Sequence, residues 1–225
     1  YGILTFDDAL VHSSNIWAAK VGLREGLDGV YAAVSAFGFG ERTRIDMPGE
    51  SPGLVRPRKV LTRDSLLSIP MGQEIAVTPL QLLTAYTAMV NGGTLLRPQT
   101  VAKIENARGE PLYAMQPQAV RRAISPQTSK AMREILTRVV DEGTGRKAWC
   151  KEYPIGGKTG TAQKVENGHY SHEKCVGSFC GFAPANNPRL VCLVTVDEPV
   201  KSKGYYGGTV AAPAVREILR RSLSA

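Results

Sequence analysis

The spacing of apolar residues along the chain predicts helices in its first two thirds and strands in its last third. Apolar positions recur at helical spacing over residues 16–23 and 30–37. Thr5 and Asp8 form the pattern of a capping box ahead of them. The segments TPLQLLTAYTAMVNGG and SPQTSKAMREILTRVVDEGTG each begin with a capping hydroxyl followed by Pro, which predicts two further helices. The first of these is apolar all round, so we expect it to be buried.

The period changes from 3.6 to 2 over residues 157–165, 176–183 and 190–196, which predicts three strands. An Asn-Gly turn pair and the segment PANNP join them by short connections, so consecutive strands should pair antiparallel. An amphipathic stretch over residues 213–223 predicts a helix that covers one face of the sheet. Helices before and after a run of antiparallel strands indicate an α+β fold.

Two segments are less regular. Residues 42–63 are rich in Pro, Gly and charge without any period, which predicts a long surface loop of the kind that is often functional. A short strand and hairpin are predicted around residues 99–112. We therefore expect a helical part at about 1–145 and a sheet with its closing helix at about 150–225.

Composition and charge narrow the class of protein. The chain has 225 residues, 43% apolar and 21% charged, which is typical of a globular domain and excludes a disordered or fibrous one. No apolar run reaches the roughly 18–20 residues of a membrane helix. The net charge of +8 is scattered in pairs such as Arg121-Arg122, without interleaved aromatic residues, so we expect no nucleic-acid partner. A basic surface that faces an anionic wall polymer or lipid headgroups fits this charge as well as nucleic acid would. Solvated charged faces remain the simplest interpretation.

Cysteine and histidine do not predict a metal site. The chain has four cysteines, Cys150, Cys175, Cys180 and Cys192. No CxxC pair occurs, and Cys180 and Cys192 lie in predicted strands, where we expect small buried apolar side chains. His169, His172 and Cys175 are three residues apart but have no evident fourth ligand, so a polar hairpin tip is the better interpretation. We expect neither a metal nor a cofactor.

The segment PIGGKTGTAQK, residues 154–164, places lysine, glycine and hydroxyl groups in a predicted strand. Side chains alternate along a strand, so Lys158 and Gly160 should face one way and Thr159 and Thr161 the other. At a sheet edge, the backbone could pair with an extended peptide while Lys and Thr bind a carboxylate. Gly160 would leave room for that approach. A solvated glycine-rich edge strand explains these four letters alone equally well.

A second polar group stands at residues 13–15, SSN, in the break between the first two predicted helices. A hydroxyl and an amide can project together there, although helix capping by Ser13 or Ser14 is an equal alternative. An early S-x-N and a late K-T-G are two of the three motifs of serine acyl-transferases that recognise penicillin, which carry S-x-x-K, S-x-N and K-T-G.

On these motifs the chain resembles the C-terminal two thirds of the transpeptidase domain of a class B penicillin-binding protein. The resemblance covers nearly the whole chain through VHSSNIWAAKVG, FGFG, GQEIAVTPLQLLTAYTAMVNGG, KTGTAQK, GFAPANNPRLV and YYGGTVAAPAVREI. Thr159, where elongation-type relatives more often have serine, and the paired Tyr205 and Tyr206 make it most similar to the division-type enzymes. The implied fold is serine β-lactamase/transpeptidase-like, an antiparallel sheet flanked by helices, here incomplete at its N-terminus.

The resemblance implies a peptidoglycan D,D-transpeptidase of septal wall synthesis. Its serine nucleophile would be acylated by the D-Ala-D-Ala end of a stem peptide, release the last D-Ala, and pass the acyl group to an amine of a neighbouring strand. Ser13 would help relay a proton to the leaving amine, and Asn15 would hold the amide of the bound stem. Lys158 would supply positive charge to the substrate carboxylate and to the proton relay.

The remaining site residues implied by the resemblance lie beside Lys158. The hydroxyls of Thr159 and Thr161 would bind the substrate carboxylate, and the Thr161 backbone N–H would be one oxyanion-hole donor. Such a donor contributes roughly 2.7–4 kcal/mol to lowering the barrier. Gly160 would matter by its absence of bulk.

The first motif, with the nucleophile and the lysine that takes its proton, should precede Ser13 by some tens of residues. No S-x-x-K occurs there, so we expect the nucleophile in a segment upstream of this chain. Residues 1–225 alone should then fold poorly, since several large apolar contacts of about 2–5 kcal/mol each would be lost. An S-x-x-K at Ser171 and Lys174 falls in the predicted hairpin tip, and we interpret it as coincidence, because a nucleophile needs a rigid setting.

Two other functions stay open. In a D,D-carboxypeptidase or β-lactamase-like enzyme water would deacylate the serine, whereas a non-catalytic penicillin-binding or sensor module would only bind. The long proline-rich loop and the TPLQLL helix weigh against the former. The resemblance implies as partners stem peptides ending in D-Ala-D-Ala, β-lactam antibiotics, and divisome membrane proteins such as a glycosyltransferase. It implies a location in the periplasm, on the outer face of the cytoplasmic membrane, with an anchor outside this chain.

Overall fold

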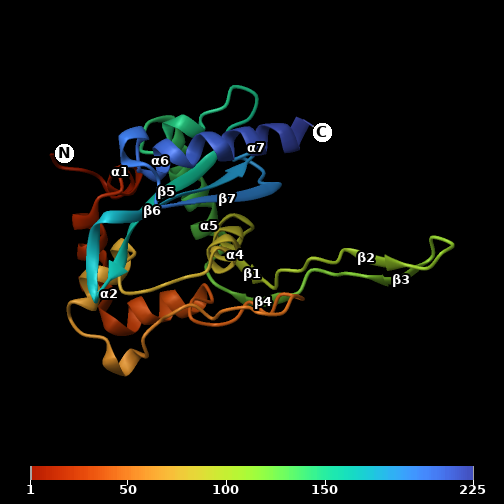
Figure 1. Ribbon diagram of the computed structural model, residues 1–225, viewed down its shortest axis with the longest axis horizontal. Coiled ribbons are helices and arrows are strands. Elements are labelled where there is room, and N and C mark those ends of the chain that lie inside the picture. The colour runs from red at the N-terminus through yellow and green to blue at the C-terminus, as the bar shows by residue number, and fades with distance from the viewer. Residues whose placement is uncertain (1, 225) are drawn as a thin grey trace.

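A three-stranded antiparallel sheet forms the centre of the molecule (Figure 1). The computed structural model describes residues 2–224, except for the side chains of His172 and Lys203. The strands are β5 (Gly156–Glu166), β6 (His169–Ala183) and β7 (Leu190–Asp197), in the order β5-β6-β7. Within the described residues β5 is therefore an edge strand, as the K-T-G hypothesis requires.

Helices cover both faces of this sheet. On one face, α7 (Ala212–Ser224) packs on Phe179, and on the other, α4 (Pro79–Val90) and α5 (Pro126–Asp141) pack around Phe182. Figure 1 shows α7 and α4 on opposite sides of the strands. Consecutive residues of β6 point to opposite faces, so each of these aromatic rings fills a different apolar layer. The predicted α+β architecture with a flanked antiparallel sheet is confirmed.

The N-terminal helices form a third packed layer. After α1 (Phe6–Val11), α2 runs over Asn15–Ala36 and is interrupted at Gly26, where φ is 69°. Its two halves correspond to the two helices predicted at residues 16–23 and 30–37. Two short helices, α3 (Ser65–Ser68) and the 3-10 turn η2 (Ile69–Met71), were not predicted.

The loop over residues 42–63 is irregular apart from the short 3-10 helix η1 (Arg58–Val60), as predicted. A single bridge from Leu54 to Ala76 ties it to the segment before α4. That helix begins with a capping box of Thr78 and Gln81, and beyond Pro79 its residues are buried or half-buried. The expected buried helix is therefore confirmed.

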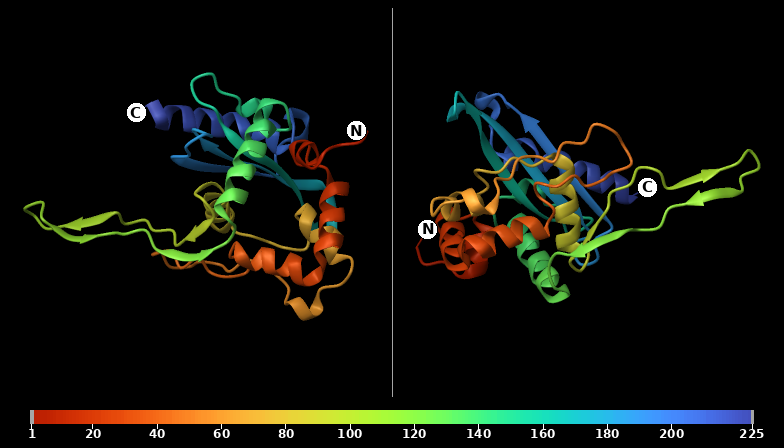
Figure 2. Two further views of the ribbon diagram at one scale, coloured as in Figure 1. Left: turned by 180° about the vertical axis from the view of Figure 1, so that it is seen from behind. Right: turned by 90° about the horizontal axis from the view of Figure 1, so that it is seen from below.

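A long hairpin projects from the body between α4 and α5 (Figures 1 and 2). Its base is β1 (Thr94–Leu96) paired with β4 (Ala119–Arg122), and its tip is β2 (Lys103–Glu105) paired with β3 (Pro111–Ala114). The prediction of a hairpin around residues 99–112 is confirmed, but both strands of its base, β1 and β4, lie outside that range and were missed. All residues of β2 and β3 are exposed, so this arm adds little to the core.

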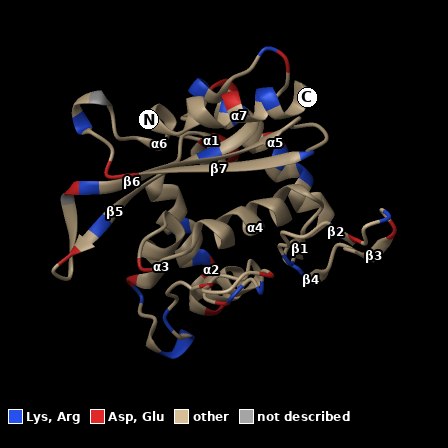
Figure 3. Cartoon of the chain, turned by 45° about the vertical axis from the view of Figure 1, so that its right-hand side comes forward, with Lys and Arg blue, Asp and Glu red and all other residues tan. Residues whose placement is uncertain are grey.

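Polar residues extend β5 and β6 beyond the packed layers. β6 begins at His169, well before the predicted start at residue 176, because ion pairs such as Lys174 to Glu166 hold the outer hairpin. Figure 3 shows acidic and basic positions together at this end of the two strands. The small helix α6 (Gly207–Val210), which precedes α7, was also missed. None of the described helices has both the length and the hydropathy to span a bilayer.

Candidate active site

A cleft of about 1040 Å³ separates the first half of β5 from the junction of α1 and α2. The turn before η3 (Arg146–Ala148), the start of α6 and the end of η2 complete its walls. Ser13, Asn15 and Lys158 through Thr161 all line it. The two motifs, 145 residues apart at Ser13 and Lys158, thus share one groove.

The S-x-N wall is shaped by a turn between two helices. Ser14 is the N-cap of α2, and its hydroxyl accepts a hydrogen bond from Trp17 N–H at 3.3 Å. Ser13 precedes it in a left-handed conformation with φ of 56°, which is uncommon for a residue other than glycine. Ser14 therefore takes the capping role that sequence left open between two serines, and Ser13 and Asn15 remain exposed at the cleft.

Lys158 reaches across the cleft to the opposite wall. Its Nζ donates to Ser13 Oγ at 2.7 Å and to the carbonyl of Thr159 at 3.2 Å. Burial of the ammonium lowers the pKa of Lys158 to about 8. The lysine is thus largely protonated at neutral pH, yet it can release and regain a proton at little free-energy cost.

Thr159 and Thr161 make their side-chain contacts with segments other than the S-x-N turn. Thr159 Oγ1 lies 2.9 Å from Thr144 Oγ1, in the turn that leads to η3. Thr161 Oγ1 accepts the backbone N–H of Gly207 at 3.2 Å. Both hydroxyls line the same cleft as Lys158, so the strand edge presents one ammonium and two hydroxyl groups to it.

Gly160 and Gly207 pack closely against their neighbours. A Cβ on Gly160 would lie 2.6 Å from Oγ of Ser178, its partner in β6. A Cβ on Gly207 would lie 2.0 Å from the carbonyl oxygen of Ser178 and 2.4 Å from that of Gly160. The absence of a side chain at Gly160 thus has a packing reason in addition to the predicted clearance for a peptide.

Sequence reasoning missed several residues of the cleft. Arg146 and Lys147 of η3 add two exposed cations, and Thr144 adds a hydroxyl from the turn before η3. Tyr206 lines the opposite end, its ring 4.2 Å from that of Tyr205. The tyrosine and glycine pairs of YYGG were the available signal for the second group, whereas the turn before η3 has no distinctive pattern.

The second S-x-x-K lies outside the cleft. Ser171 Oγ accepts the backbone N–H groups of Glu173 and Lys174, and the Lys174 ammonium pairs with Glu166 at 2.6 Å. The hydrogen bond with Glu166 is the main cause of a raised pKa at Lys174. A hydroxyl and a lysine held in this way serve the hairpin, as expected of a coincidental match.

Among the residues that the structure describes, the cysteines and histidines form no chemical centre. All four cysteines are free thiols, and burial raises the pKa of Cys180 and Cys192. Cys175 is buried while His169 is exposed at the hairpin, and the side chain of His172 lies outside the described part. Among the described side chains, no group of three His, Cys, Asp or Glu is arranged for a metal ion.

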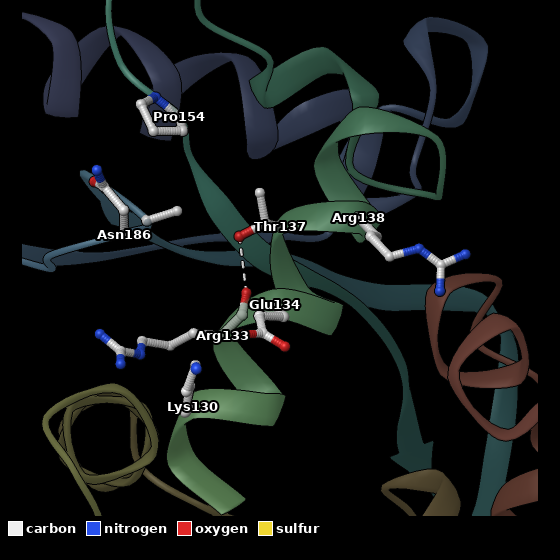
Figure 4. A pocket seen from close by; sticks show the side chains of 8 residues that line it. Lys130, Arg133, Glu134, Thr137, Arg138, Pro154 and Asn186 are labelled. Atoms are coloured by element: carbon white, nitrogen blue, oxygen red, sulfur yellow. Dashed lines mark hydrogen bonds between the residues drawn. The ribbon is translucent and has the colours of Figure 1, made fainter. Parts of the chain in front are cut away.

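A separate hollow of about 560 Å³ lies between α5 and the loop after β6 (Figure 4). Lys130 and Arg133 project into it from α5, opposite Asn186. Arg138 points away toward α1, where it pairs with Asp8 at 2.6 Å. This hollow contains no residue of the S-x-N or K-T-G motif, and we do not assign the chemistry to it.

Comparisons of this chain with known proteins agree on one family. The penicillin-binding protein transpeptidase domain matches residues 1–220. Stage V sporulation protein D of Bacillus subtilis is 41% identical over 224 residues, 99% of this chain and 34% of that protein. The probable peptidoglycan D,D-transpeptidase PenA of Neisseria gonorrhoeae is 36% identical over 213 residues, 94% of this chain and 35% of that protein.

A solved structure shares the fold. Penicillin binding protein 3 of Mycobacterium tuberculosis, complexed with ampicillin, matches with a TM-score of 0.88 and 31% identity. The match covers 97% of this chain and 50% of that one. This chain spans about a third of the length of the curated relatives described above.

Proposed function

Because this chain belongs to the penicillin-binding protein transpeptidase domain family, in its class B branch, we propose that it forms the substrate-binding side of a peptidoglycan D,D-transpeptidase. The observation that carries the proposal is the contact of Lys158 Nζ with Ser13 Oγ at 2.7 Å. This contact brings the S-x-N and K-T-G motifs into one cleft, which supports a shared task in binding and proton transfer.

In the proposed reaction, a stem peptide ending in D-Ala-D-Ala pairs with the edge of β5. Its terminal carboxylate lies against the hydroxyls of Thr159 and Thr161, with Lys158 as the nearby positive charge. Asn15 holds the amide of the stem, and the Thr161 backbone N–H donates to the developing oxyanion. The attacking serine and its partner lysine come from a segment outside residues 1–225.

Proton transfer follows from the hydrogen-bond direction at Ser13. Because Lys158 donates to Ser13 Oγ, the Ser13 hydroxyl hydrogen is available to the leaving amine. An ester to the attacking serine forms, the C–N bond to the last D-Ala breaks, and the amine takes the proton relayed through Ser13. An amine of a second strand then displaces the serine and forms the cross-link. Attack by water instead would make the protein a D,D-carboxypeptidase.

We further propose a role in septal wall synthesis. Thr159 and the stacked Tyr205 and Tyr206 support the division type, as does the likeness to the sporulation and penicillin-binding proteins named above. β-Lactam antibiotics are proposed ligands of the same cleft, since the M. tuberculosis relative is described in complex with ampicillin. A divisome membrane protein such as a glycosyltransferase is a proposed partner, on the outer face of the cytoplasmic membrane.

The test uses the full-length protein that contains this chain. Treatment with a fluorescent penicillin, followed by mass spectrometry of the labelled peptide, should place the adduct on a serine outside residues 1–225. An adduct on a serine of this chain would overturn the assignment of the nucleophile, and absence of any adduct would support a module without acyl-enzyme chemistry. A D-Ala-D-Ala peptide offered with an acceptor amine then separates cross-linking from hydrolysis.

A further inference from the structure

A third hollow, of about 760 Å³, lies at the base of the projecting hairpin. The end of α2, the loop over residues 41–44 and the pair β1 and β4 surround it. It shares no lining residue with the cleft that contains Lys158. The two cavities are therefore separate sites.

The lining of this hollow is strongly basic. It contains four arginines, Arg42, Arg44, Arg97 and Arg121, against one acidic residue, Glu41. Figure 3 shows positive positions at β4, where the hairpin leaves the body. Apolar residues also line the hollow, among them the buried Leu95. An excess of positive charge in a hollow favours an anionic ligand.

Several guanidinium donors in this hollow lack an acidic partner. Arg121 pairs with Glu41 through one terminal nitrogen, while its Nε is buried and has no hydrogen-bond partner among the described residues. Arg97 uses its donors on the backbone carbonyl of Arg44 and on the Gln118 side chain. Arg42 forms no ion pair within the described part of the chain, although its positive charge interacts with the Glu50 carboxylate. These donors without acidic partners leave the positive charge of the hollow only partly neutralised, which favours a bound anion.

The loop that carries Arg42 and Arg44 is held firmly in place. Asp46 accepts hydrogen bonds from the backbone and hydroxyl of Thr100, both at 2.8 Å, and the Glu50 carboxylate accepts from the backbone N–H groups of Thr43 and Arg44. These bonds lower the pKa of Asp46, with the Thr100 hydroxyl as the main cause. Arg44 itself has a φ of 61°, a conformation that favours glycine. Strained backbone at a residue other than glycine is typical of functional positions, so we expect the Arg44 side chain to take part in binding at the hollow.

We propose that this arginine hollow binds a phosphate-bearing ligand. Guanidinium groups reach it from three separate segments, represented by Arg42, Arg97 and Arg121, so the ligand must accept hydrogen bonds from several directions. The tetrahedral oxygens of phosphate do this, whereas the two oxygens of a carboxylate lie in one plane. The ligand is either a soluble phosphate compound or the headgroup of an anionic lipid.

Calorimetric titration of the full-length protein with sodium pyrophosphate, at constant ionic strength, tests the proposal. We expect saturable binding to one site, and at least about tenfold weaker affinity in the double variant Arg42→Gln, Arg44→Gln. Glu41→Gln should strengthen binding several-fold, since the carboxylate that competes for Arg121 is removed. Penicillin labelling should be unchanged in these variants, because none of the residues lines the K-T-G cleft.

The matched control is Arg133→Gln, which removes the same charge from the hollow beneath α5, where Arg133 also has an unpartnered buried Nε. This control should bind pyrophosphate like the parent protein. The proposal is overturned if pyrophosphate does not saturate, if Arg133→Gln weakens binding as much as the double variant, or if a poly-glutamate peptide binds as tightly. Arg42→Gln alone provides a second variant should the double one unfold.

The source of the phosphate is decided by a vesicle assay. Binding to phosphatidylglycerol vesicles that falls in the double variant, and that pyrophosphate displaces, identifies a lipid headgroup. Binding to vesicles that the variants leave unchanged, together with arginine-dependent pyrophosphate binding, identifies a soluble phosphate compound. Phosphatidylcholine vesicles serve as the uncharged control.

Discussion

The two ends of strand β5 carry lysines in opposite electrostatic settings. Lys158, at the cleft end, is half-buried beside the neutral hydroxyl of Ser13, and burial lowers its pKa to about 8. Lys164, at the hairpin end, forms ion pairs with Asp197 at 2.8 Å and Glu198 at 2.7 Å, which raise its pKa. A lysine with paired carboxylates is locked in its charged form, whereas a desolvated lysine without them is suited to move a proton.

The backbone also differs between the two ends of β5. At the cleft end, pairing with β6 is regular, and Gly160 and Gly207 let strand and helix approach closely. At the hairpin end, the register shifts between Gln163 and Val165. Rigid close packing holds the group that we assign to chemistry, and solvated ion pairs hold the one that we assign to structure.

Replacing Lys158 should have the largest effect of any change on this strand. In Lys158→Met the side chain stays long and unbranched, but it is one atom shorter and loses the charge and the hydrogen bond to Ser13. We expect the rate of acylation by a fluorescent penicillin to fall by about 10²–10³-fold in the full-length protein, as when a preorganised electrostatic donor is removed. A loss below tenfold would show that the two motifs meet for structural reasons only. Circular dichroism checks that the variant folds.

The pH dependence of acylation should separate the same two lysines. Since the ammonium form of Lys158 is the one that attracts the substrate carboxylate, the second-order acylation rate should decline as pH rises through about 8. Lys158→Arg keeps the charge and should move this limb beyond the accessible range, at a lower plateau. Lys164→Met should leave the limb in place. A limb that persists in Lys158→Arg would assign it to another group.

The contribution of Lys158 to stability should rise with pH in the range where the acylation rate declines. The unfolded chain holds the proton of this lysine up to about pH 10.4, while folded Lys158 releases it near pH 8. Between these values the unfolded state binds more protons, so the contribution of Lys158 to the free energy of unfolding rises with pH. Urea titrations at pH 7 and pH 9.5 should show this rise in the parent protein relative to Lys158→Met.

How much of this could be predicted from sequence depends on whether a feature is local. α4 was predictable because its capping residue, Pro79 and the closing glycines all lie within the helix and its ends. α3 was not, since its position depends on α2, where a Cβ on Gly22 would lie 2.0 Å from the carbonyl oxygen of Leu66. α6 contains two glycines, which disfavour a helix, and it packs where Gly207 meets the carbonyl oxygen of Ser178.

In the site, too, the features set by local sequence were predictable and those set by tertiary contacts were not. The K-T-G strand was predictable from a period of two, and the S-x-N residues from their family motif. Which serine caps α2 was not, because Ser13 and Ser14 have equal capping propensity and only the turn geometry distinguishes them. Thr144 and Arg146 reach the cleft through tertiary packing of a turn that has no sequence signature.

Gly160 lies between the two lysines in β5, and we expect its replacement to have an effect of intermediate size. Gly160→Ala places a methyl group 2.6 Å from Ser178 Oγ and should destabilise the fold by about 1–3 kcal/mol, with about tenfold slower acylation. Adding Ser178→Ala removes that clash. Recovery of both stability and acylation in the double variant would assign the glycine to strand packing. Recovery of stability alone would support the predicted need for clearance along the substrate backbone.

The smallest effect should come from the hairpin lysine. Lys164→Met removes two exposed ion pairs, which are weak because water and salt screen them, so we expect acylation to stay within about twofold of the parent. The thermal midpoint should fall by at most about 2 °C at low salt, and the difference should vanish in 1 M NaCl. Because the raised pKa of Lys164 keeps it charged up to strongly alkaline pH, this difference should not change between pH 6 and 9. A large loss of acylation in Lys164→Met would mean that the outer hairpin takes part in substrate binding, and the contrast between the two ends of β5 would fail.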